Sequence, residues 1–394
     1  MTRETTSERN SVLNGICPYF TMFPLEFPHR VLRQHAGSGA KVLDPFCGRG
    51  TSLYAARMLG MPAYGIDSNP VAVAISRAKL ANTTPTAIVT AAQRILNESS
   101  CVTCPDGEFW RLAYAPEVLE SLCRLRSSLL DDASSAARQA LVGIILGALH
   151  GPMPKSAPSY FSNQCTRTFA PKPAYAVRFW KKRHLRPPEV DVLGLIEQRA
   201  EHFYSDGDAT AAGRVTCGDS RQASSFRTAS AADCNWIITS PPYYGMRTYL
   251  PDQWLRLWFL GGPPHVDYTN KRQVNHRSPD LFAGELQKVW RHSAEASADD
   301  CRLVIRFGAI NDRKIDPVAL IKSSLADTPW RITTVKPAGD ASTGRRQALH
   351  FARKAAPALG EYDVWAVREG SLSRGRHRVI SRRPGATARG GTQR

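Results

Sequence analysis

The stretch Lys41-Val42-Leu43-Asp44-Pro45-Phe46-Cys47-Gly48-Arg49-Gly50-Thr51 decides the fold. Its short apolar run is typical of a buried strand, and the strand leads into a turn with two glycines. A helix-like run follows to Leu59, then a second strand at 63–67 and a second helix-like run at 71–81. Strands that alternate with helices in this way predict a parallel sheet in an α/β domain.

The same alternation returns after residue 210. With the first two strands, the later candidates predict a mostly parallel sheet of seven strands, and the last two candidates are expected to pair as an antiparallel edge. These later candidates are residues 214–217, 235–239, 302–307, 330–335 and 362–367. The α/β domain is therefore expected to comprise residues 41–81 and 211–370.

Residues 82–210 break this alternation and are expected to form a helical insertion. Apolar residues recur with a helical period at 117–130, 136–149 and 190–203. With 394 residues, the chain is long enough for one large core, or for a core that carries an inserted subdomain.

Membrane, export and metal signals are absent from the sequence. The longest apolar run, Ala140–Leu149, is too short to cross a bilayer, and the first thirty residues lack the pattern of an export signal. A cytoplasmic protein is expected. The close pair Cys101 and Cys104 has no second pair or histidine set nearby, so no metal site is expected.

The formal net charge of +18 is concentrated in two stretches. Residues 151–188 contain eight Lys or Arg and residues 371–394 contain seven, and neither stretch contains an acid. Because basic side chains that neutralise phosphates release counterions, a polyanion such as nucleic acid is the predicted partner. The alternative is a solvated basic surface. Residues 371–394 are also expected to be a disordered tail.

The glycine turn has the composition of a cofactor site. Gly48 and Gly50 allow a sharp turn and a close ligand approach, and the helix that starts at Thr51 offers free amides to a polar group. Asp67, at the end of the second strand, is placed to accept hydrogen bonds from ribose hydroxyls. Leu53 stands where a dinucleotide fingerprint has its third glycine, so the residues predict a nucleoside-bearing cofactor of open identity.

The stretch Thr239-Ser240-Pro241-Pro242-Tyr243 follows a predicted strand and suits chemistry on a base amine. The Ser240 hydroxyl and the Pro241 carbonyl are acceptors for the two N–H groups of such an amine, whose lone pair they would aim. Two prolines fix the backbone of the turn. Tyr243 offers a flat face to a base that has been swung out of the helix.

Taken together, residues 42–51, 65–67 and 240–243 resemble the motifs of the S-adenosylmethionine-dependent DNA amino-methyltransferases. The resemblance covers about 240 residues and implies the Rossmann-like class I methyltransferase fold. It implies S-adenosyl-L-methionine as cofactor, with Ser240, Pro241, Pro242 and Tyr243 as the catalytic residues. The cofactor-binding residues that it implies are Tyr19, Asp44, Phe46, Gly48, Gly50, Thr51, Asp67 and Asp219.

By the same resemblance, residues 1–40 cover the methionine end of the cofactor and Asp219 meets its adenine. The insertion is then the expected target-recognition region. Lys181, Lys182 and Arg183 are expected to contact the phosphates of double-stranded DNA, with the neighbouring aromatic residues against bases or sugars. The alternative is that these aromatic residues anchor the segment to the core while its charges face water.

Several functions remain open at this level. A serine at position 240 is most typical of cytosine-N4 enzymes, and adenine N6 is the alternative target. A transfer-RNA guanosine-N2 methyltransferase, or a nucleic-acid-binding protein that kept the fold without catalysis, would share some of these motifs. Cytosine-C5 chemistry is rejected because no Pro-Cys dipeptide occurs. If the enzyme serves restriction-modification or phage defence, a cognate restriction endonuclease is a further expected partner.

Overall fold

The computed structural model describes residues 12–19, 23–98, 101–151, 160–163, 172–205, 211–245, 250–267, 274, 276–309, 315–340 and 360–369. Within these residues, seven strands form one sheet in the order β3-β2-β1-β4-β5-β7-β6. The strands are β1 (Val42–Asp44), β2 (Ala63–Asp67), β3 (Gly213–Cys217), β4 (Cys234–Thr239), β5 (Ser297–Gly308), β6 (Trp330–Asp340) and β7 (Gly360–Arg368).

The sheet confirms the predicted α/β architecture, a mostly parallel sheet of seven strands. Strands β1 to β5 pair in parallel, while β7 runs antiparallel between β5 and β6. The predicted antiparallel edge is therefore the β6–β7 pair, with the reversed strand one place in from the edge. The chain proceeds from β1 outward to β3 and then returns to β4 on the other side of β1, so the strand order reverses between β1 and β4.

Helices cover both faces of the sheet because alternate strand residues point to opposite faces. Val42, Ile238 and Val304 pack under helices from the first third of the chain, whereas Leu43 and Ile237 pack under helices from the last half. The first set is α2 (Glu26–His35), α3 (Thr51–Met58) and α4 (Pro70–Leu80). The second is η2 (Ala223–Phe226), α11 (Arg227–Ser230), α13 (Pro279–Glu295) and α14 (Pro317–Leu325).

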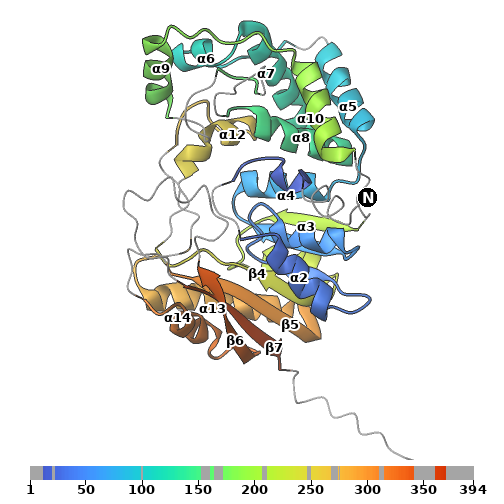
Figure 1. Ribbon diagram of the computed structural model, residues 1–394, viewed down its shortest axis with the longest axis vertical. Coiled ribbons are helices and arrows are strands. Elements are labelled where there is room, and N and C mark those ends of the chain that lie inside the picture. The colour runs from blue at the N-terminus through green and yellow to red at the C-terminus, as the bar shows by residue number, and fades with distance from the viewer. Residues whose placement is uncertain are drawn as a thin grey trace, which may run out of the picture.

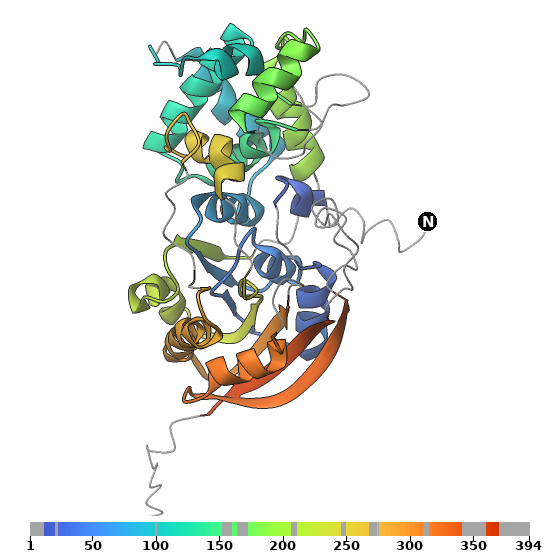
Figure 2. The same cartoon turned by 90° about the vertical axis from the view of Figure 1, so that its left-hand side faces the viewer.

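The predicted helical insertion forms a layer at one end of the molecule, away from β6, β7 and α14 in both views (Figures 1 and 2). Its helices are α5 (Pro85–Asn97), α6 (Glu108–Ala113), α7 (Pro116–Asp131), α8 (Ala136–Ala148), α9 (Pro173–Lys182) and α10 (Val192–Tyr204). Elements from elsewhere in the chain add buried residues to the core of these helices, among them η1 (Val12–Gly15) and α12 (Trp254–Phe259), which follows η3 (Leu250–Gln253).

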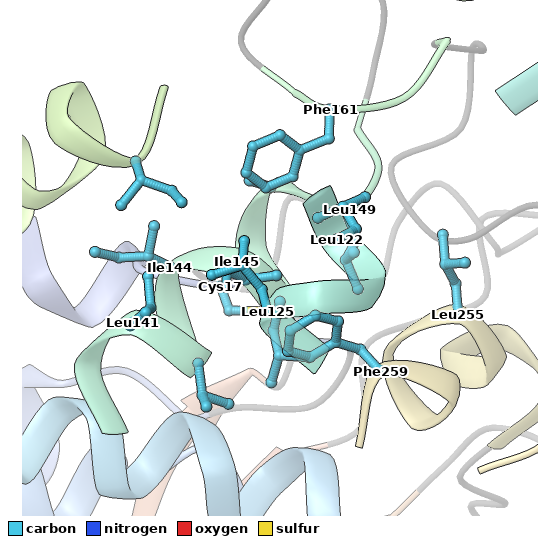
Figure 3. Close-up of a cluster of buried hydrophobic side chains, with 14 of the residues drawn as sticks. Cys17, Leu122, Leu125, Leu141, Ile144, Ile145, Leu149, Phe161, Leu255 and Phe259 are labelled. Atoms are coloured by element: carbon cyan, nitrogen blue, oxygen red, sulfur yellow. The ribbon is translucent and has the colours of Figure 1, made fainter. Parts of the chain in front are cut away.

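Figure 3 shows how this second core is built. Ile145 of α8 lies beside Cys17 from the N-terminal segment, and Leu141 and Ile144 of the same helix belong to one cluster with Phe259 of α12. Helix α8 also packs on α4, which covers the sheet, so the insertion and the α/β domain share a continuous interior. Among the helices described, none combines the length and the apolar character needed to cross a bilayer.

Candidate active site

The glycine turn between β1 and α3 is closed by a helix that packs against it. Gly50 caps α3 with a φ of 75°, in the left-handed region. A Cβ at this position would lie 2.6 Å from the Oγ of Ser76 on α4, so a larger residue would be strained and would clash. The Ser76 hydroxyl also donates to the Gly48 carbonyl at 2.9 Å. Thr51 is buried as the first residue of α3, and the predicted turn is thus a fixed structure.

Asp67 at the end of β2 organises the same turn. Its Oδ2 accepts the Gly48 amide at 2.9 Å and its Oδ1 accepts the Asn69 amide at 2.8 Å. Burial raises the pKa of Asp67 to about 6, although both amides favour the charged form. The residue is partly exposed, and each carboxylate oxygen has a further lone pair. The ribose-binding role predicted for Asp67 remains a prediction, and its geometry suits that role.

The N-terminal segment reaches this end of β2 through Tyr19. The Tyr19 hydroxyl accepts a hydrogen bond from the Asn69 side chain at 2.9 Å, while Asn69 caps α4 by accepting the Val71 amide. The ring is 5% exposed, and burial raises the pKa of the phenol. Asn69 therefore connects Tyr19 to Asp67, and the cofactor contact predicted for Tyr19 remains a prediction.

Asp44 connects the glycine turn to the neighbouring strand. Its carboxylate is fully buried and accepts hydrogen bonds from the Phe46 amide at 3.0 Å and from the hydroxyls of Ser52 and Thr239, each at 2.6 Å. Burial raises its pKa to about 6 despite these three donors. These contacts make Asp44 a positioning residue, and its predicted contact with cofactor remains a prediction. The Phe46 ring packs edge-to-face on Trp290.

The Ser240–Tyr243 turn begins where β4 ends, beside the glycine turn. Strands β1 and β4 are adjacent and parallel, with Leu43 paired to Ile237, so both turns leave the sheet at the same edge. Ser240 and Pro242 are partly exposed and Pro241 is buried. In open α/β sheets, ligands bind at this edge where the strand order reverses. The structure thus brings the two halves of the predicted site together.

The Tyr243 side chain is 3% exposed in this arrangement. Its ring meets Phe307 edge-to-face with centroids 5.2 Å apart, and its hydroxyl donates to Glu361 Oε1 at 2.5 Å. Stacking of this ring on a flipped base stays a prediction.

Asp219 follows β3 at the same edge of the sheet. Arg221 donates to both of its carboxylate oxygens and to Glu285 on α13. Burial works to raise the pKa of Asp219, but the Arg221 side chain and amide outweigh it and hold the pKa below its ordinary value. The neighbouring Ser220 hydroxyl donates to the Pro45 carbonyl, which ties this turn to the glycine turn. The adenine contact of Asp219 remains a prediction. Arg221 already uses part of the hydrogen-bond acceptor capacity of this carboxylate.

The predicted DNA-contacting residues lie on and just after α9. Lys181, Lys182 and Arg183 are exposed; Lys181 forms an ion pair with Glu108 of α6, and the Arg183 guanidinium lies 4.2 Å from the Phe179 ring centre. The basic cluster is far from α13 and α14, at the opposite end of the molecule (Figure 1).

The expectation that the aromatic residues of this segment face bases is wrong for Phe161, Phe179 and Trp180. All three are buried in the core of the helical layer, with at most 9% of the residue exposed. Apolar rings gain more from this core than from solvent, so α9 directs them inward and its charges outward. Phe169 lies outside the described residues.

Sequence reasoning missed several residues that hold the site. Thr239, Ser52 and Asn69 stand within or beside the predicted motifs, Ser76 lies in the predicted helix that follows, and the hydroxyl or amide groups of these residues were the signal available. Glu361 has no such signal, because it is an ordinary strand residue 118 positions away from the tyrosine that it contacts.

Known proteins match the first part of the chain. A family model described as DNA methylase, for N6 and N4 enzymes, matches residues 1–78. Over these residues the chain is similar to N6/N4 DNA methylases. The type II methyltransferase M.MjaII of Methanocaldococcus jannaschii is 34% identical over 73 residues, which is 18% of this chain and 14% of that protein. The family match contains the glycine turn and Asp67 but not Ser240–Tyr243.

Solved methyltransferase structures resemble the chain weakly. The rRNA methyltransferase AviRa of Streptomyces viridochromogenes has a TM-score of 0.35 at 13% identity, with 92% of each chain covered. A modification subunit of a putative type I restriction enzyme from Vibrio vulnificus has a TM-score of 0.32 at 10% identity, with 93% of this chain and 48% of that chain covered. Likenesses of this size do not identify a reaction.

Proposed function

We propose that this protein transfers a methyl group from S-adenosyl-L-methionine to an exocyclic amine of a base in double-stranded DNA. The observation that carries the proposal is the Asp44 carboxylate, which binds the glycine turn through Phe46 and the end of β4 through Thr239. A cofactor held by the first turn and an amine held at Ser240 would therefore meet at one edge of the sheet. The match of residues 1–78 to the DNA methylase family supports the same reaction.

The residues present fit the cofactor. At Gly48 the nearest atom that a Cβ would meet is the Phe46 carbonyl oxygen, at 4.0 Å, so a ligand can approach the backbone there, and the partly exposed Asp67 carboxylate has lone pairs for ribose hydroxyls. Tyr19 closes the same end of the site. When bound, the cofactor supplies an electrophilic methyl sulfonium, so the protein needs to aim a nucleophile rather than create a strong one.

Aiming is the task of Ser240 and Pro241. The Ser240 hydroxyl and the Pro241 carbonyl would accept the two N–H groups of the amine, which concentrates the nitrogen lone pair and directs it toward the methyl. Rings at Pro241 and Pro242 fix two backbone φ angles, and the hydrogen bond from Thr239 to Asp44 fixes the residue before Ser240. The acceptors are thus set in place before substrate arrives.

The substrate is proposed to be duplex DNA from which the target base is flipped. The helical layer would supply the target-recognition region, with the exposed cluster Lys181, Lys182 and Arg183 on backbone phosphates. Cytosine N4 is the proposed target because position 240 is serine, and adenine N6 is the alternative outcome of the test below. A role in restriction-modification or phage defence, with a cognate endonuclease, is part of the proposal.

Expression in a host that lacks DNA methylation tests this function directly. Single-molecule sequencing of the host DNA should show N4-methylcytosine, or N6-methyladenine, at one recurring sequence. Ser240→Ala should abolish the mark while binding of the cofactor, measured by calorimetry, is retained. Ser121→Ala on the exposed face of α7 is the matched control and should leave the mark intact. Unmodified DNA in the host that expresses the wild-type protein would refute the proposal.

A further inference from the structure

Glu361 on β7 holds the tyrosine that ends the catalytic motif. The Tyr243 hydroxyl donates to Glu361 Oε1 at 2.5 Å, and both side chains are buried, at 3% and 4% exposure. A hydrogen bond to a carboxylate is about twice as strong as one between neutral groups, and burial of both partners protects it from water. The contact therefore fixes the direction of the tyrosine ring.

The strand beside it is shaped for this contact. Gly308, the last residue of β5, pairs with Glu361 across the antiparallel β5–β7 ladder. A Cβ at Gly308 would lie 3.0 Å from the Glu361 Cγ and 3.1 Å from the Tyr243 Cε2, so any larger residue would press on both. The preceding Phe307 meets the tyrosine ring edge-to-face. Strands β5 and β7 thus both contribute residues that contact the Tyr243 side chain.

We propose that Glu361 is a positioning residue for methyl transfer and acts through Tyr243. The Ser240–Pro242 turn would then be fixed at both ends by buried carboxylates, by Asp44 through Thr239 and by Glu361 through Tyr243. Between these points the two prolines leave few free torsions, so loss of either hydrogen bond moves the acceptors that aim the amine. This inference rests on the proposed function, but one of the measurements that test it, amide hydrogen exchange, requires no methyl transfer.

The variants Glu361→Ala, Glu361→Gln and Tyr243→Phe, made in the full chain, separate the hydrogen bond from bulk and charge. Single-turnover transfer of labelled methyl from S-adenosyl-L-methionine to unmethylated bacterial DNA should slow about 10–100-fold in Glu361→Ala, which is the effect of losing a hydrogen bond to a charged group. Glu361→Gln keeps an acceptor oxygen and should stay within about fivefold of wild type. Cofactor affinity should be unchanged in both, because Glu361 acts at the other turn.

Amide hydrogen exchange supplies the readout that needs no activity. The peptide that contains Tyr243 and Tyr244 should exchange about tenfold faster in Glu361→Ala and Tyr243→Phe, and at the wild-type rate in Glu361→Gln. Adding Glu361→Ala to Tyr243→Phe should slow transfer no further, since the glutamate acts through the tyrosine hydroxyl.

Wild-type exchange and transfer in both Glu361→Ala and Tyr243→Phe would overturn the inference. A wild-type protein that transfers no methyl would refute the proposed function, and the exchange rates would still decide the role of Glu361. Should Glu361→Ala fail to fold, Tyr243→Phe decides, because it removes the same hydrogen bond and retains the ring.

Discussion

A single carboxylate, that of Asp44, connects the glycine turn to the end of β4, where the Ser240–Tyr243 turn begins. It has no exposed surface and receives three hydrogen bonds from two different parts of the chain. Burial nevertheless disfavours its charged form and raises its pKa to about 6 from an ordinary value of 3.8. Asp44 therefore positions the site at some expense to stability, a combination common at functional sites.

The stability of the protein should report this burial through its pH dependence. Because the folded-state pKa of Asp44 is raised, its protonated carboxyl stabilises the folded protein. This contribution to the free energy of unfolding is complete below about pH 4 and is lost as pH rises through 6. Asp44→Asn cannot ionise, so between pH 4 and pH 7 the free energy of unfolding of wild type should fall relative to this variant by up to about 3 kcal/mol. Urea unfolding of both proteins at several pH values measures the difference. Parallel curves across this range would contradict the raised pKa.

At the scale of elements, helix α9 presents an apolar face and a basic face. Ala176, Phe179 and Trp180 are buried in the helical layer, while Arg178, Lys181 and Lys182 are exposed on the same helix. This pattern explains why the basic segment stays attached to the core while its charges remain accessible. Glu108 neutralises part of this cluster by pairing with Lys181.

Replacing Lys181, Lys182 and Arg183 together with glutamine should weaken binding to DNA and flatten its salt dependence. The slope of log K against log salt should decrease in magnitude by about two to three, since each phosphate contact contributes about 0.9. Fluorescence anisotropy with a labelled duplex at several salt concentrations measures the slope. The matched control changes three exposed basic residues at the opposite end of the molecule, Lys288, Arg291 and Lys322. An equal loss of slope in both triple variants would show that α9 is not the contact surface.

For the whole molecule, the sheet was predictable and much of the helical packing was not. The sequence predicts a strand at all seven positions, and the structure extends three of them by several residues, because β5, β6 and β7 are longer than the segments that indicated them. Helices α5 and α9 were missed, and the proline that begins each does not explain this, because α4 and α7 also begin at prolines and were predicted.

The candidate site divides in the same way. Local motifs, in which residue type and spacing indicate the chemistry, contain Gly48, Gly50, Asp67 and Ser240. Thr239 binds Asp44 across 195 positions, and no local pattern indicates that pairing. Such contacts depend on the strand order, because β1 and β4 become neighbours only when the chain crosses back past its first strand.

If Asp44 holds the two turns in the register needed for methyl transfer, Thr239→Val should disturb that register. Valine keeps the shape of the buried side chain and removes the hydroxyl that donates to Asp44. Single-turnover transfer of labelled methyl to DNA should fall about tenfold or more, with cofactor affinity unchanged, because small displacements of the acceptors lower the rate steeply. Transfer at the wild-type rate in Thr239→Val would show that the hydrogen bond between Thr239 and Asp44 does not set this register.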